Sequence, residues 1–130
     1  MLTTCQQLNQ KTQGGSTCKL CYANAYEKSG KIYYHGIDKK VWKQLDTYGG
    51  KLVENITQAV ARDCLAHAMQ AIDKAGYNIV MHVHDEIVLE VPQNTDPISA
   101  IETLMSKKPP WAQGLPLKGD SFYASYYKKD

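Results

Sequence analysis

The sequence lacks any uninterrupted apolar run of the roughly 20 residues that a helix needs to cross a bilayer. Its most apolar stretch, residues 79–91, is interrupted by two histidines and three acidic residues. The first residues also lack the basic segment and apolar core of a signal peptide. We therefore expect a soluble chain that has no membrane partner and is cytoplasmic.

Cysteines are few, and neither sign of charge dominates. The four cysteines, Cys5, Cys18, Cys21 and Cys64, are sparse and indicate a reducing compartment. Cys18 and Cys21 have the spacing of half a zinc ribbon, but a closed site needs a second such pair, so we expect buried strand cysteines. The net charge of +2, from 15 basic and 13 acidic residues, is too small to indicate nucleic-acid binding by itself.

Large apolar side chains are nearly absent from residues 1–16, which are rich in Gln, Thr, Asn and Gly. Such a segment cannot bury enough surface to offset the entropy lost on ordering. The sequence therefore predicts a flexible N-terminal segment over 1–16 and one domain over 17–130, long enough for a modest core.

The rest of the chain alternates between strand and helix patterns. Two strands, within 17–25 and 31–35, flank the turn signal Ser29-Gly30, and two β-branched runs at 79–83 and 87–91 suit a tight hairpin. A second helix is predicted to open at Asp96-Pro97 and to stop before Pro109, and residues 121–127 are predicted as an edge strand. This order indicates an α+β fold, an antiparallel sheet with its hairpin packed against one long and one shorter helix.

The long helix is predicted over 50–74, with Gly76 as its C-terminal stop. Its apolar stripe is expected to comprise Val53, Ile56, Val60, Cys64 and Ala71. Its opposite face carries Asn55, Gln58 and Arg62, which could bind base edges, sugars and phosphates, although a polar helix face is usually only solvated. We expect the first half to face a groove and the second half to be buried.

The hairpin between the two β-branched runs carries His84, Asp85 and Glu86 at its tip. Adjacent carboxylates on a strand point to opposite sides, so one can reach into a cleft while the other supports it. Oxygen ligands suit Mg²⁺ or Mn²⁺, and Mg²⁺ commonly takes one or two carboxylates together with water and phosphate oxygens. An ordinary solvated hairpin has the same composition, and His82, His84 and Asp85 could instead form a zinc site of a small hydrolase.

Residues 48–63 read YGGKLVENITQAVARD, and residues 83–90 read VHDEIVLE. Together these two motifs resemble family A DNA polymerases, the bacterial DNA polymerase I type, and especially their phage-encoded branch. The first resembles the palm helix that follows template and primer, and the second resembles the third catalytic motif. The resemblance extends from about Cys18 to the C-terminus, including WAQGLPL at 111–117 and YYKKD at 126–130.

The resemblance implies a catalytic role for three residues and DNA contacts for a partly overlapping set. Asp85 would bind the catalytic Mg²⁺ ions, Glu86 would help to position metal and primer end, and His84 would contact the primer terminus. Gln58, and by a match offset by one residue Asn55, would contact DNA together with Arg62. The implied partners are primer-template DNA and, in the complete enzyme, a dNTP.

The chain has no counterpart of the family's first catalytic motif or of its fingers helix. Two-metal phosphoryl transfer needs carboxylates from two strands and a basic clamp on the triphosphate. We therefore expect a polymerase fragment that is inactive alone, paired with an upstream polymerase fragment. A non-catalytic DNA-binding or partner-docking module is the alternative, and surface freed by truncation is expected to form a homodimer.

Overall fold

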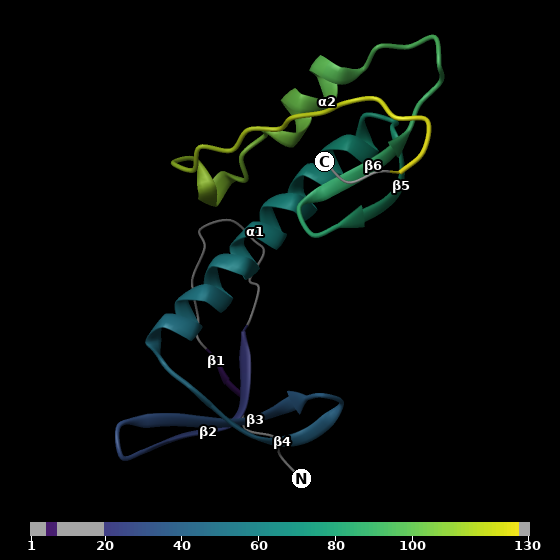
Figure 1. The fold of residues 1–130 in the computed structure, drawn as a ribbon. Helices are drawn as coiled ribbons and strands as arrows, with labels where there is room; N and C mark the ends of the chain where they lie inside the picture. The colour runs from purple at the N-terminus through teal and green to yellow at the C-terminus, as the bar shows by residue number, and fades with distance from the viewer. Residues whose placement is uncertain (1–4, 8–19, 128–130) are drawn as a thin grey trace. The chain divides into compact units, whose positions relative to one another are not determined.

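The computed structural model describes residues 5–7 and 20–127 (Figure 1). The chain forms two compact units, 1–60 and 61–130, and each is described by itself. Both contain antiparallel strands and helix, which confirms the predicted α+β class. The strands belong to two sheets, one of four strands and one of two, and not to a single sheet. Apart from Cys5–Gln7, the predicted flexible segment 1–16 lies outside the described residues.

The first unit is built on the four-stranded sheet, with strand order β1-β2-β3-β4. The strands are β1 (Cys5–Gln7), β2 (Cys21–Lys28), β3 (Lys31–Asp38) and β4 (Val41–Thr47). The antiparallel pairing of β2 with β3 around Ser29-Gly30 is as predicted. Strand β4 was not predicted from the sequence.

Two two-residue turns connect the last three strands of this sheet. Ser29 and Gly30 have φ values of 53° and 75°, and Lys39 and Lys40 have 49° and 66°. Positive φ at both central residues is the type I′ geometry, which matches the twist of the flanking strands. Such turns usually contain Asn or Gly, so the lysine pair carried no sequence signal for the β3–β4 hairpin.

Helix α1 (Gly49–Lys74) begins in the first unit and ends in the second, followed by Gly76 at φ 86° as the predicted stop. Its buried side chains, Cys64, Leu65, Ala68 and Ile72, all lie in the second half, as expected. The predicted stripe is wrong at its start, because Val53 is 62% exposed. Periodicity marks a face that can be buried, and burial begins only where the second unit packs on the helix.

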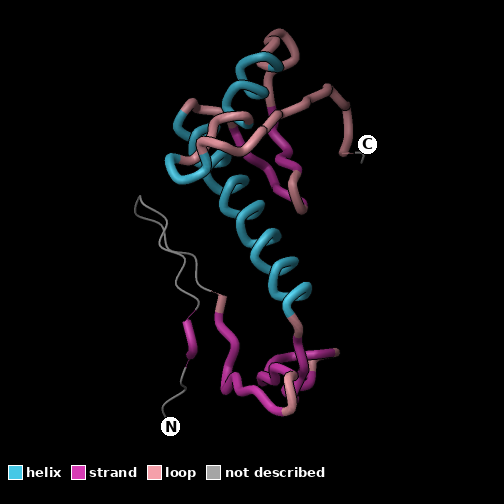
Figure 2. Tube along the Cα trace, turned by 90° about the vertical axis from the view of Figure 1, so that its left-hand side faces the viewer, coloured by secondary structure: helices cyan, strands magenta, loops and turns pink. Residues whose placement is uncertain are grey.

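The second unit adds the hairpin of β5 (Asn78–Val83) and β6 (Glu86–Glu90), and the helix α2 (Ile98–Met105). Figures 1 and 2 both show hairpin and α2 beside the C-terminal half of α1. Helix α2 has Pro97, not Asp96, at its N-cap, although Asp96 Oδ1 accepts a long 3.5 Å hydrogen bond from the Ile98 amide. A short 3₁₀ helix, η1 (Pro110–Ala112), follows after Pro109.

The predicted edge strand over 121–127 is wrong, since this segment is irregular (Figure 2). Side chains, not a strand ladder, attach it to the rest of the unit. The Ser121 amide and hydroxyl donate to Glu102 Oε1 at 3.2 and 3.1 Å. Gly119 is buried just before it and donates to Ser106 Oγ at 2.8 Å. A Cβ at Gly119 would lie 2.6 Å from that of Met105, so the close approach to α2 needs glycine.

The two described cysteine side chains lie in different environments. Cys21 on β2 is exposed, against the expectation of a buried strand cysteine, and Cys18 lies outside the described residues. Cys64 on α1 is buried, and burial together with the neighbouring Asp63 charge raises the pKa of its thiol. In the described part of the chain, no helix is both long and apolar enough to span a bilayer.

We predict that iodoacetamide near pH 8 alkylates Cys21 at least about tenfold faster than Cys64, because reaction requires an accessible thiolate. Peptide mass spectrometry of samples quenched over time measures both rates. In denaturant the two rates should become similar. Equal rates in the native protein would contradict the burial of Cys64.

Candidate active-site turn

The turn between β5 and β6 has only two residues, His84 and Asp85. Val83 pairs with Glu86 across the hairpin, so Glu86 is the first residue of β6. The prediction that Glu86 lies at the tip is therefore wrong. His84 has φ 54°, in the left-handed region that few residues other than glycine adopt and where histidine is enriched. The tight reversal therefore presents His84 and Asp85 outward.

The carboxylate of the turn, Asp85, and that of the next residue, Glu86, have different surroundings. Asp85 is exposed, and among the described residues none donates a hydrogen bond to its carboxylate. Glu86 is half-buried, and its Oε2 accepts a 3.1 Å hydrogen bond from the hydroxyl of Tyr127. Asp85 is thus available to a cation, while Glu86 is held by the C-terminal tail.

The contact with Glu86 changes the pKa of Tyr127. Partial desolvation, the hydrogen bond to Glu86 and the negative charge of Glu86 together raise the pKa of the Tyr127 phenol. A phenolate could no longer donate to the carboxylate and would be repelled by it. Sequence reasoning missed this contact, because 41 residues separate its partners and no local pattern joins them.

The polar residues predicted on α1 are divided between the two units. Asn55 and Gln58 belong to the first unit and Arg62 to the second. Asn55 Nδ2 donates to the Tyr22 hydroxyl at 2.9 Å, which ties this side chain to the sheet. Gln58 is exposed and donates to Glu54 Oε1 at 3.3 Å, and Arg62 is exposed. Their roles in DNA binding stay predictions.

Metal-ligand chemistry distinguishes the two metal hypotheses. In the described segments, no three His, Cys, Asp or Glu side chains gather to hold a metal ion, so the zinc cluster of His82, His84 and Asp85 is not formed. Mg²⁺ needs only one or two protein carboxylates and keeps several waters. An exposed Asp85 next to a fixed Glu86 fits that requirement.

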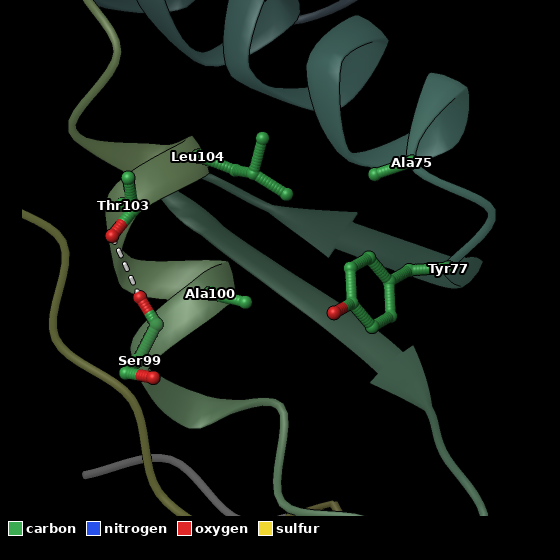
Figure 3. A pocket seen from close by; sticks show the side chains of 6 residues that line it. All are labelled: Ala75, Tyr77, Ser99, Ala100, Thr103 and Leu104. Atoms are coloured by element: carbon green, nitrogen blue, oxygen red, sulfur yellow. Dashed lines mark hydrogen bonds between the residues drawn. The ribbon is translucent and has the colours of Figure 1, made fainter.

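The second unit has two open pockets, and neither is lined by residues of the acidic turn. One, of about 410 Å³, is lined by Ala75, Tyr77 and residues of α2 (Figure 3). The other, of about 500 Å³, is lined by residues 76–78, 90–92 and 95–97. Neither has Asp85 or Glu86 in its wall, so the candidate site is an exposed turn and not a cavity.

The sequence is similar to part of a DNA polymerase, which assigns the chain to the class of DNA polymerase segments. The chain is 48% identical over 112 residues to the DNA polymerase of Bacillus phage SP02. The match covers 86% of this chain but 17% of that polymerase. It confirms the predicted similarity to a phage DNA polymerase segment. No family model and no solved structure matches the chain.

We predict that Glu86→Ala lowers the pKa of Tyr127, because the substitution removes the hydrogen bond and the charge and leaves only the desolvation. Titration of ¹³Cζ-tyrosine by NMR measures the pKa, with the signal assigned through Tyr127→Phe. Because the folded pKa is raised above about 10, the contact stabilises the fold fully below that pH and is lost as pH rises through the raised pKa.

Glu90→Ala is the matched control, since Glu90 is also on β6 and accepts a hydrogen bond from Asn78. It should leave the Tyr127 titration unchanged. A Tyr127 pKa that is the same with and without Glu86 would contradict the contact.

Proposed function

We propose that the chain is part of the palm of a family A DNA polymerase and carries its third catalytic motif. The observation that carries the proposal is the 48% identity to a phage DNA polymerase. The match spans 112 of the 130 residues, so the residues left unmatched at the ends are too few to reach α1 or the β5–β6 hairpin. The reaction of the complete enzyme is then template-directed transfer of a deoxynucleotide to a primer 3′ end.

Residues of the turn, of β6 and of α1 have different roles in that reaction. Asp85, exposed at the reversal, is the metal ligand, and a bound Mg²⁺ stabilises charge on the reacting phosphate oxygens. Glu86 follows it at the start of β6, accepts a hydrogen bond from Tyr127, and helps to position the metal and the primer end. His84, turned outward by its positive φ, contacts the primer end. Gln58, Asn55 and Arg62 contact the DNA.

This chain contributes one acidic strand end to the reaction. The second carboxylate strand and the basic clamp on the incoming triphosphate belong to the upstream part of the polymerase. Each electrostatic group missing from a transition state costs on the order of a hundredfold or more in rate. The chain by itself therefore extends no primer.

A non-catalytic DNA-binding module is the second candidate. The exposure of Gln58 and Arg62 on α1 favours it, because exposed polar side chains can contact a ligand even when no metal site is complete. The two candidates differ in whether Asp85 matters for the activity of the assembled protein.

We predict that replacing the matching segment of the SP02 polymerase with this chain gives a chimera that extends a primer with Mg²⁺ and dNTPs. Asp85→Ala in the chimera should lower the rate by on the order of a hundredfold or more, because the developing phosphate charge loses its metal ligand. Gel analysis of primer extension, with binding of primer-template DNA measured in parallel, provides the readout.

Asp73→Ala is the matched control, an exposed aspartate in the last turn of α1, and should extend as the parent chimera does. The isolated chain should give no product. If Asp85→Ala and Asp73→Ala extend equally well, Asp85 is not a metal ligand and the DNA-binding candidate replaces the catalytic one.

A further inference from the structure

The strand register of the first unit places several aromatic residues on one face of its sheet. Tyr26 lies opposite Tyr33, His35 opposite Gln44, and Ile37 opposite Trp42. Paired residues share a face, as do alternate residues along a strand. We call this side the aromatic face; it comprises Tyr26, Tyr33, His35, Ile37, Trp42 and Gln44.

The rings of the aromatic face form two nearly parallel pairs. The Tyr26 and Tyr33 ring centroids lie 5.4 Å apart at 22°, and those of His35 and Trp42 lie 6.5 Å apart at 23°. The amide of Gln44, the register partner of His35, donates a hydrogen bond to the Tyr26 hydroxyl. Because Tyr33 and His35 are two residues apart on β3, the pairs follow each other at about 7 Å.

The opposite face of the same sheet is packed against other side chains of the first unit. Tyr22 and Tyr34 meet edge to face at 5.0 Å, and Asn55 of α1 donates to the Tyr22 hydroxyl. A Cβ at Gly36 would lie 3.1 Å from both Leu45 and the Tyr34 ring, which shows how closely this side is packed. Internal packing therefore accounts for the tyrosines of that face but not for the aromatic face.

The aromatic face remains open. Tyr26, Trp42 and Ile37 are 43%, 59% and 70% exposed. Large apolar side chains gathered on an exposed face indicate a binding surface more often than isolated ones do. The arrangement of the rings suits a flat aromatic ligand.

Lysines flank this face at both ends. Lys28 and Lys31 are paired on the aromatic face at one end, and Lys39 and Lys40 form the exposed turn at the other. The nearby acidic residues Glu27 and Asp38 lie on the opposite face in the strand register, and Asp38 pairs there with Lys43 at 2.6 Å. Asp46, opposite Tyr33, adds one negative charge to the face.

We propose that the aromatic face binds single-stranded nucleic acid. Unpaired bases stack on the exposed rings, and the backbone phosphates lie at the lysines at either end, the combination by which proteins hold single strands without reading sequence. A duplex does not fit, because its bases are already stacked on one another. The contact is separate from the acidic turn and holds whether or not the chain takes part in nucleotidyl transfer.

A second copy of the chain suits this face less well. Two such faces pressed together would bring the lysine ends of one copy onto those of the other, and like charges in contact oppose association. A polyanion has the complementary charge and, as a single strand, also offers flat apolar bases. Charge and ring geometry therefore favour the same ligand.

We predict that the full chain binds a fluorescein-labelled oligothymidine of about 15 nucleotides, measured by fluorescence anisotropy at low salt. Trp42→Leu and Tyr26→Leu keep apolar bulk but remove a stacking ring, and each should weaken binding by about fivefold or more. Trp42→Phe retains a ring and should retain most of the affinity. Circular dichroism verifies that each variant is folded.

The lysines are tested through salt dependence. Each phosphate contact on a single strand adds about 0.7 to the slope of log affinity against log salt. Lys28→Ala combined with Lys31→Ala should therefore reduce that slope by about 1.4. Tyr126→Ala, an exposed tyrosine of the second unit, is the matched control and should bind as the unmodified chain does.

Unchanged oligothymidine affinity in both Trp42→Leu and Tyr26→Leu would overturn the proposal. So would sedimentation showing that these substitutions dissociate a dimer while DNA binding stays the same, because the face would then be a protein interface. Asp85→Ala should leave oligothymidine binding intact, so failure of this proposal and failure of the proposed catalytic role give different results.

Discussion

The pairing of Val83 with Glu86 is the constraint on which the candidate site depends. It leaves two residues for the chain reversal, which forces His84 to a positive φ and turns Asp85 into solvent. It also places Glu86 on a strand, where Tyr127 can reach it. A longer loop would leave both carboxylates free to move, and the strand register would define the position of neither.

The C-terminal tail fixes this hairpin without forming a strand. Three side-chain contacts attach it at successive points: Ser121 to Glu102 on α2, Tyr123 to Asp96 before α2, and Tyr127 to Glu86 on the hairpin. The buried core of the second unit is small, with Ile72 fully buried and few other large side chains enclosed. The hydrogen bonds from the tail therefore add to a small amount of apolar packing in this unit.

The two faces of the sheet in the first unit differ, since one is packed against the chain and the other is exposed. The period of two along a strand puts neighbouring tyrosines of β3 on opposite sides. Tyr34 packs against its own chain, while Tyr33 joins the open row of rings. Strand β3 thus contributes to both the packed face and the exposed aromatic face. The aromatic face and the acidic turn share no residues.

The sequence by itself determined the α+β class, the long helix with its Gly76 stop, the Ser29-Gly30 turn and the acidic hairpin, because each has a local signal in periodicity or turn chemistry. Its motifs also predicted the similarity to a phage DNA polymerase. The structure alone revealed β4, whose Lys39-Lys40 turn has no typical composition, the exposure of Val53, the irregular tail and the contact of Tyr127 with Glu86. These four features depend on which segments far apart in the sequence pack together. A local sequence pattern does not specify that packing.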